Sequence, residues 1–121
     1  MADEVMPNPE EMLPLTPAVI HILLALADGE KHGYGIMKAI EVTTDGRMKM
    51  GPGTLYGSIK RMLAAGLVEE SHERPDPELD DERRRYYRLT PFGQRVLRAE
   101  VERLAHLVSV ARTKRLLRGM V

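Results

Sequence analysis

A long stretch without a helix breaker dominates the C-terminal part of the chain. It begins at Thr90-Pro91, where a hydroxyl side chain precedes proline, and it runs to about Arg118. Apolar residues recur in it at alternating intervals of four and three, as in a helix that packs along a partner helix: Leu97, Val101, Leu104, Val108 and Ala111. A chain of 121 residues has no second helix of matching length, so the pattern predicts a homodimer joined through this helix.

The same helix-start signal occurs at Thr16-Pro17. Residues 18–27 are apolar nearly all round, which is typical of a helix buried between others, and Asp28-Gly29-Glu30 ends it. A second helix is predicted over about residues 32–43. Gly33 and Gly35 lie in its first turn, where they permit the close approach of another backbone.

A third helix is predicted from Pro52 to about Ala65, followed by Gly66, which suits a left-handed C-terminal cap. Its buried stripe consists of Leu55, Ile59, Met62 and Leu63. The opposite side presents hydroxyls and cations without an acid: Thr54, Tyr56, Gly57, Ser58, Lys60 and Arg61.

Two short strands are predicted at residues 67–73 and 84–89, joined by a polar, acidic loop, and together they form a hairpin. Tyr86 and Tyr87 alternate on the second strand, and we expect Tyr87 to face the core. The fold class is therefore mainly α with a small β-hairpin (α+β). The expected organisation is a flexible segment at 1–14, a winged helix-turn-helix domain at 15–90 and a long C-terminal dimerisation helix at 91–121.

Positive charge is concentrated in two blocks of a chain whose net charge is zero. Residues 46–68 contain four basic residues and no acid, and residues 83–98 contain six arginines and no acid. A phosphate backbone responds to such local potential rather than to the total charge. The alternative is that each block is only a solvated face.

In a winged helix-turn-helix domain the third helix enters the major groove of duplex DNA and the hairpin touches the flanking backbone. The predicted contacts on this helix are Thr54, Tyr56, Ser58, Lys60 and Arg61, with Arg84 and Arg85 at the hairpin stem. The start of the helix also offers free backbone N–H groups to a phosphate. The alternatives are a solvated helix face for Lys60 and Arg61, and a hydroxyl at the core edge for Tyr56.

Three segments also carry a family resemblance: HGYGI at residues 32–36, PGTLY at 52–56 with KRML at 60–63 and GLV at 66–68, and RYYRLTPFG at 85–93. In this order and spacing the chain resembles the PadR-like transcriptional regulators, and its length resembles the small subgroup with a single C-terminal dimerisation helix. The resemblance implies a homodimeric winged-helix repressor that leaves its operator when a small effector or stress signal arrives. It also implies DNA contacts at Tyr34, Thr54, Tyr56 and Lys60.

The sequence departs from the family pattern in two places. Gly57 stands where the family often has proline, and the loop at residues 73–82 is long and acidic. Phosphate repels an acidic wing tip, so we expect the arginines of the wing stem to contact DNA instead of the tip.

Other functions find little support in the sequence. The absence of cysteine excludes disulfides, thiolate metal sites and cysteine nucleophiles, and the histidines His21, His32, His72 and His106 lack the spacing of metal ligands. No nucleophile elbow or phosphate-binding glycine loop is present, so neither an enzyme nor a cofactor is expected.

The sequence also bears on the cellular location of the protein and on two alternative functions, protein binding and RNA binding. The chain has no basic, apolar signal at its start, and its apolar run at residues 19–27 is too short to span a membrane, so a cytoplasmic protein is expected. The main alternative function is a winged-helix adaptor that binds proteins and not DNA. Single-stranded RNA binding is disfavoured because, apart from the tyrosines, the chain offers few aromatic residues for base stacking.

Overall fold

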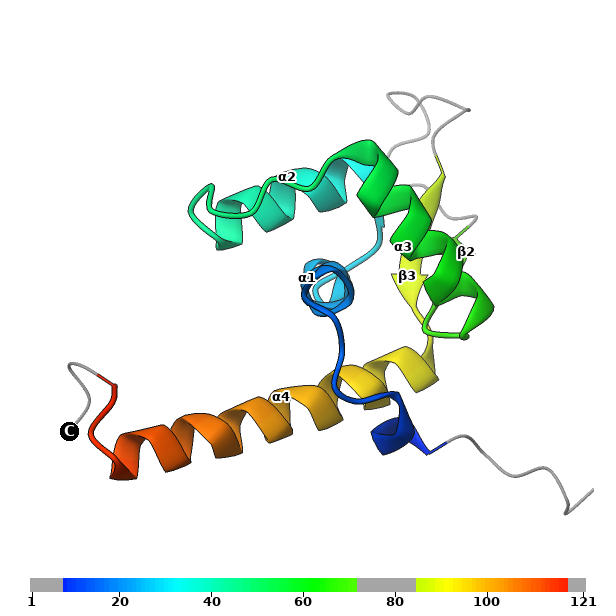
Figure 1. Cartoon of the computed structure of the whole chain (residues 1–121). Coiled ribbons are helices and arrows are strands. Elements are labelled where there is room, and N and C mark those ends of the chain that lie inside the picture. Colours follow the sequence, from blue (N-terminus) through cyan, green and yellow to red (C-terminus); the bar gives the residue numbers. More distant parts are fainter. Residues whose placement is uncertain (1–7, 72–84, 118–121) are drawn as a thin grey trace, which may run out of the picture.

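The computed structural model describes residues 8–71 and 85–117, which form five helical elements and three strands (Figure 1). In chain order these are η1 (Pro9–Met12), α1 (Pro17–Leu26), β1 (Lys31–His32), α2 (Gly33–Thr43), α3 (Pro52–Ala64), β2 (Val68–Ser71), β3 (Tyr86–Leu89) and α4 (Pro91–Thr113). The mainly helical class with a small antiparallel sheet agrees with the sequence prediction.

Helix α1 lies at the centre of the fold. Figure 1 looks along its axis, with α2 on one side, α4 on the other, and α3 with the sheet on a third side. Ile22 and Leu23 of α1 have no exposed surface, and the apolar side chains of the other elements surround them. Within the apolar run Leu24 is the large side chain that faces outward, at 46% exposure. The expectation of a buried first helix is therefore confirmed.

Both Thr-Pro signals begin helices as predicted. The Thr16 hydroxyl oxygen accepts a hydrogen bond from the Val19 N–H at 3.2 Å, and that of Thr90 accepts one from the Gly93 N–H at 2.9 Å. Each bond satisfies one of the N–H groups that a helix start leaves unpaired. Gly66 follows α3 with a φ of +77°, which confirms the left-handed position expected there.

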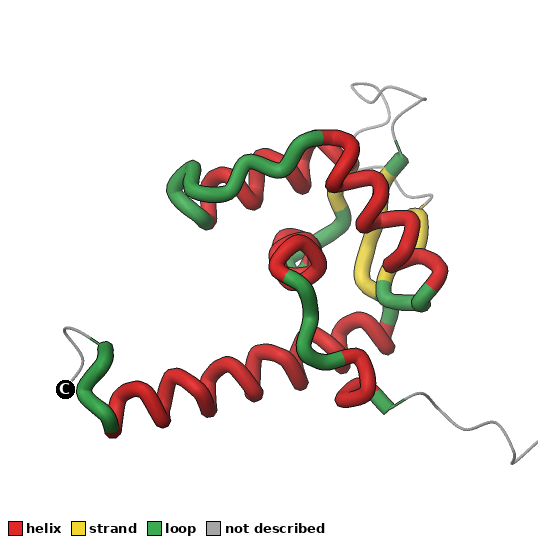
Figure 2. Tube along the Cα trace, in the orientation of Figure 1, coloured by secondary structure: helices red, strands yellow, loops and turns green. Residues whose placement is uncertain are grey.

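The sheet has three strands in the order β1-β3-β2, all antiparallel, and not only the predicted hairpin (Figure 2). The added strand β1 pairs Lys31 with Tyr87 and His32 with Tyr86. It was missed because two residues are too few to show a strand period. Tyr87 is 5% exposed, which confirms its predicted inward direction.

Helix α4 differs from the prediction at its end and in one seam residue. It ends at Thr113, before the predicted Arg118, and Arg115 just beyond it has a φ of +60°. Leu97 is 8% exposed because the first turns of α4 pack against α1 and β3. Leu97 therefore belongs to the core of its own chain, and its assignment to the dimerisation seam was wrong.

The N-terminal segment packs against α4. The sequence predicted a flexible segment over residues 1–14, of which residues 1–7 lie outside the described residues. In the structure Pro9–Met12 forms the 3-10 helix η1 in contact with α4. Beside it the Leu15 N–H donates to Glu100 Oε2 at 2.9 Å. Among the described helices, none is long and apolar enough to cross a membrane.

Candidate DNA-binding surface

The outward face of α3 carries most of the predicted contacts. Thr54, Tyr56, Lys60 and Arg61 are all exposed, while Leu55, Ile59 and Met62 on the other side are buried. Gly51 precedes the helix without capping it through a side chain. The first N–H groups of α3 therefore have no capping side chain, and with the helix dipole they offer a binding point for an anion.

Ser58 was wrongly predicted to be on this face. It has no exposed surface, and its Oγ accepts a hydrogen bond from Arg61 Nη2 at 3.3 Å. Ser58 lies three residues after Leu55 and one before Ile59, so it falls inside the buried stripe of the helix. Its hydroxyl is consequently not available to a phosphate.

The ring of Tyr56 spans the gap between α3 and the start of α2. Its hydroxyl packs directly against Gly33, and a Cβ at Gly33 would lie 2.6 Å from the ring carbon Cζ. The sequence predicted that Gly33 permits the approach of another backbone, but the group that approaches is this side chain. Tyr56 is 47% exposed, so part of its ring remains open to solvent while its hydroxyl contacts Gly33.

Tyr34 lies beside this junction, on the exposed side of α2. It is 59% exposed and stacks on the His32 ring at a centroid distance of 6.4 Å. The Lys38 Nζ lies 6.0 Å from the centre of the Tyr34 ring. Tyr34 and Tyr56 therefore both lie near the first turn of α2.

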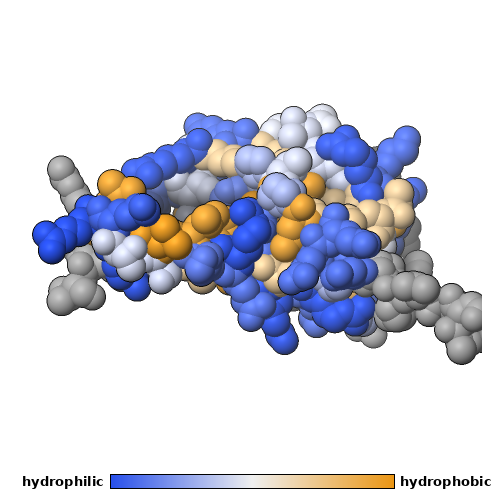
Figure 3. Space-filling view, turned by 60° about the horizontal axis from the view of Figure 1, so that its bottom comes forward, coloured by the Kyte–Doolittle hydropathy of each residue, from blue (hydrophilic) through white to orange (hydrophobic). Residues whose placement is uncertain are grey.

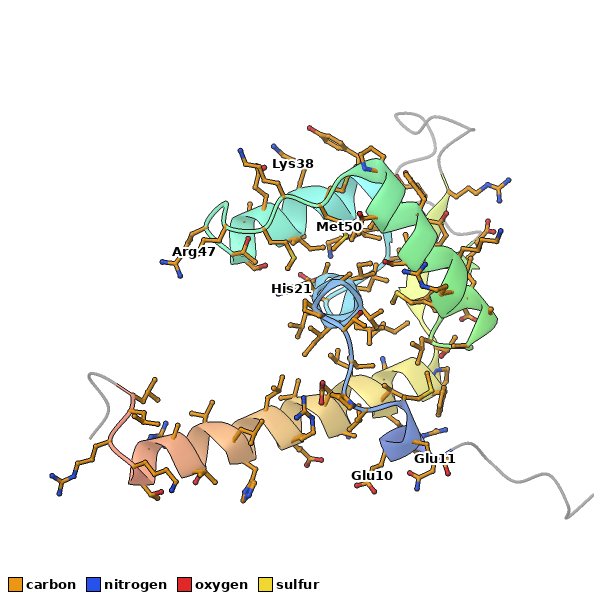
Figure 4. The ribbon with its side chains drawn as sticks, viewed as in Figure 1. Glu10, Glu11, His21, Lys38, Arg47 and Met50 are labelled. Atoms are coloured by element: carbon orange, nitrogen blue, oxygen red, sulfur yellow. The ribbon has the colours of Figure 1, made fainter. Side chains whose placement is uncertain are left out.

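Three further exposed cations, on α2 and in the loop before α3, were not predicted as site residues. Lys38 on α2, with Arg47 and Lys49 in the loop before α3, are exposed. Figure 4 shows Lys38 and Arg47 along α2 and its following loop, and Glu10 and Glu11 at the far side of the molecule on η1. Arg47 and Lys49 belong to the acid-free block at residues 46–68, so the charge pattern was the signal that could have identified them.

The wing stem contributes fewer free charges than the sequence suggests. Arg85 is exposed and its Nη1 lies 3.4 Å from Glu70 Oε2, while the Arg88 Nε donates to Glu69 Oε2 at 2.9 Å. Both arginines thus face an acid on the neighbouring strand. Arg84 and the acidic tip at residues 73–82 lie outside the described residues.

Tyr87 is the buried tyrosine of the wing. Burial raises the pKa of Tyr87, and the nearby Glu70 carboxylate raises it further. The phenol therefore remains neutral and acts as a core side chain of the sheet.

A second feature of the surface is the apolar side of α4. Val101 and Val108 of the predicted seam are 44% and 42% exposed, and Leu104 and Ala111 are half-buried. Apolar side chains outside the predicted seam are also exposed: Leu107, Val110, Leu116 and Leu117. Figure 3 shows apolar patches between hydrophilic groups along this helix. In Figures 1 and 2 the C-terminal half of α4 extends past the other described elements.

Comparisons with known proteins place this architecture in a family. Residues 22–99 match the family described as the transcriptional regulator PadR-like family. The chain is 38% identical over 92 residues to the transcriptional regulator Rv3488 of Mycobacterium tuberculosis, covering 74% of this chain and 79% of that protein. It is 41% identical over 86 residues, or 71% of this chain, to a 37.1 kDa protein of a Streptomyces fradiae transposon, but it spans only 22% of the length of that relative.

Solved structures agree in fold. A PadR family transcription regulator from Clostridium difficile has a TM-score of 0.66 and 25% sequence identity, over 81% of this chain and 97% of the other. Bacillus subtilis PadR in complex with operator DNA has a TM-score of 0.59 and 20% identity, over 73% and 47%, a likeness in fold alone. The three segments that suggested the family in the sequence lie in the matched part of the chain. The chain thus belongs to the PadR-like family of transcriptional regulators.

Proposed function

We propose that this transcriptional regulator binds duplex DNA in a sequence-specific manner as a homodimer, with α3 of each subunit in a major groove. The observation that carries the proposal is the exposed face of α3, where hydroxyls and cations occur without an acid between residues 46 and 68. A helix with this face suits the electronegative groove and its phosphates.

Each group on the surface has a role that fits its position. The uncapped N–H groups of α3, together with Tyr34 and Tyr56 at the α2 junction, bind backbone phosphates and fix the orientation of the helix. Thr54, Lys60 and Arg61 lie on the face of α3 that enters the major groove. Lys and Arg side chains donate hydrogen bonds to the edges of guanine bases there. Lys38, Arg47, Lys49 and the wing-stem arginines Arg84 and Arg85 extend the phosphate contacts to either side.

The partner of the apolar side of α4 is a second copy of the same helix. The exposed apolar residues run from Val101 to Leu117, a length that no other helix among the described residues matches. A dimer with two-fold symmetry places its α3 helices in successive turns of the duplex. The operator is then a rough palindrome with half-sites about 10 bp apart.

We further propose that the protein acts as a repressor in the cytoplasm, without enzymatic activity, and that a small molecule or stress signal releases it from DNA. Bound α3 excludes other proteins from the same groove, which is the simplest physical basis for repression. Release then requires only that the signal molecule bind the DNA-free form more tightly than the bound form.

Fluorescence anisotropy at several salt concentrations tests DNA binding. The duplex upstream of the protein's own gene is compared with a shuffled duplex of equal composition. We expect tighter binding to the first, and an affinity that falls steeply with salt because phosphate contacts release counterions. Lys60→Glu should abolish binding, whereas Lys114→Glu, an equal charge reversal beyond α4, should not.

The same experiment distinguishes DNA binding from the alternative function, a protein-binding adaptor. Absence of binding to either duplex at low salt would refute DNA binding and favour a protein-binding adaptor. The dimer is tested by light scattering on Val101→Asp, which places a carboxylate in the apolar seam and should give monomers. His106→Asp, on an exposed side of the same helix away from Val101, is the matched control and should stay dimeric.

A further inference from the structure

Two acids follow directly after the acid-free block at residues 46–68. They are Glu69 and Glu70 of β2, and each forms an ion pair with an arginine on or beside β3. Glu70 pairs with Arg85 of the wing stem, which we place among the DNA contacts, and Arg85 Nη1 lies 3.4 Å from Glu70 Oε2. The inference below rests on that proposed function and concerns the part that this acid plays in it.

The strand register places the two ion pairs on opposite faces of the sheet. Glu70 lies opposite Tyr87, and side chains that lie opposite one another on neighbouring strands point to the same face. Arg85 comes two residues before Tyr87 and therefore falls on that face as well. Glu69 lies opposite Arg88, and each is one residue away from the first pair, so both belong to the other face.

The face with Glu70 and Arg85 is the one that meets α3. Tyr87 is buried on it at 5% exposure, and α3 contacts the neighbouring strand β2 (Figure 1). Burial raises the pKa of Tyr87, and the Glu70 carboxylate raises it further. Tyr56 of α3 also raises this pKa, and Arg85 lowers it, so all three groups lie close to Tyr87. The ion pair is therefore beside the DNA-binding surface and not on the outer side of the sheet.

An exposed ion pair of this kind is easily exchanged. The side chain of Arg85 is 70% exposed and that of Glu70 is 39% exposed, so solvent weakens their attraction. A backbone phosphate is an anion like the carboxylate and accepts hydrogen bonds from the same guanidinium N–H groups. When DNA binds, Arg85 exchanges one anion for another, and the gain in free energy is smaller than for an unpaired arginine. We propose that Glu70 limits the affinity of the protein for DNA by competing with a backbone phosphate for Arg85.

The competition has a consequence for the lifetime of the complex. Affinity differences within one interface arise mainly in the dissociation rate. Glu70 therefore shortens the time that the protein stays on DNA, without any contact between the acid and a base.

Fluorescence anisotropy at about 0.15 M salt tests the competition, because charges more than about 8 Å apart are largely screened there. The probes are the duplex upstream of the protein's own gene and its shuffled counterpart. Glu70→Gln keeps the shape of the side chain and removes its charge. The affinity should rise about threefold per half-site, the magnitude of one exposed ion pair, and about tenfold for the dimer.

Glu69→Gln is the matched control, since it removes the same charge from the same strand on the opposite face. It should change the affinity by less than about twofold. Urea unfolding checks the fold of both variants, and their midpoints should stay unchanged because both side chains are partly exposed. Equal gains in affinity from the two variants would show a general charge effect and overturn the proposal.

Arg85→Gln tests whether the effect depends on the arginine. It should itself weaken binding, because a phosphate contact is lost. In the Arg85→Gln background the gain from Glu70→Gln should fall to that of Glu69→Gln. A full gain without Arg85, or unchanged affinity in Arg85→Gln alone, would refute the competition.

Failure of the proposed function would appear in the unmodified protein, as absence of binding to either duplex at low salt. Failure of the competition would appear as an unmodified protein that binds DNA and a Glu70→Gln variant that binds no more tightly. The two outcomes are therefore distinguishable in one set of titrations.

Discussion

Substitution of Gly33 tests whether the position of Tyr56 matters for DNA binding. In Gly33→Ala the new Cβ would overlap the Tyr56 hydroxyl and lie 2.6 Å from Cζ and 3.0 Å from Cε1. Ordinary contacts begin near 3.4 Å, so the ring must move away by more than an ångström. The atoms that clash are the far end of a flexible, half-exposed side chain, so the ring can swing into solvent.

The expected effects on stability and on affinity therefore differ. The free energy of unfolding should change by less than about 1 kcal/mol, because alanine favours the helix and the displaced ring loses little burial. The affinity for the operator should fall about 10- to 100-fold per half-site, since a hydrogen bond to a charged phosphate contributes about 1.5–3 kcal/mol. Tyr56→Phe, which removes only the hydroxyl, should cause a similar loss.

A double-mutant cycle decides whether the two substitutions act through the same contact. Affinities of the unmodified protein, Gly33→Ala, Tyr56→Phe and the double variant are measured by anisotropy, with urea unfolding as the stability control. We expect the double variant to bind no more weakly than either single variant. Full affinity in Gly33→Ala, or losses that simply add, would show that the placement of the tyrosine against α2 has no role in binding.

Other substitutions probe the framework of the fold. Gly93→Ala should destabilise the protein by about 3 kcal/mol in urea unfolding, because its Cβ overlaps the Leu67 carbonyl and lies 2.9 Å from that carbonyl carbon. Gly53→Ala, with nothing within 4 Å, should be neutral or stabilising, and equal effects would contradict the packing argument. Arg103 and the Leu15 N–H lower the pKa of Glu100 below its usual 4.5, so its contribution to stability is present above that pH and lost in acid. Unfolding of Glu100→Gln should accordingly depend less on pH below about 4.5 than that of the unmodified protein, and identical pH profiles would exclude this role.

The sequence was sufficient where structure depends on local chemistry. Thr16 and Thr90 each precede a helix for a local reason. The hydroxyl accepts a hydrogen bond from a backbone N–H of the first turn, and the proline that follows has a backbone φ suited to a helix. Gly66 ends α3 for a similarly local reason. The exposed cations of α3 were also predicted, since the opposite stripe of large apolar residues fixes which side faces the core.

Predictions failed where a position is decided by a distant segment. Leu97 fits the seam spacing, but the packing of α1 and β3 on the first turns of α4 buries it. Ser58 is polar and yet buried, because burial follows its place on the helix and not its hydroxyl. Strand β1 exists only because β3 lies beside it, and two residues carry no pattern of their own.

Strand β1 has a mechanical consequence. Its last residue, His32, is also the N-cap of α2, where Nδ1 accepts from the Gly35 N–H at 3.1 Å. The same ring meets the Tyr86 ring edge-on at a centroid distance of 5.3 Å. No linker residue therefore separates the sheet of the wing from α2. If the wing tilts relative to the rest of the domain, the first turn of α2 has to tilt with it. A redesign that re-aims the wing towards a different flanking sequence will also turn the tyrosines at the start of α2.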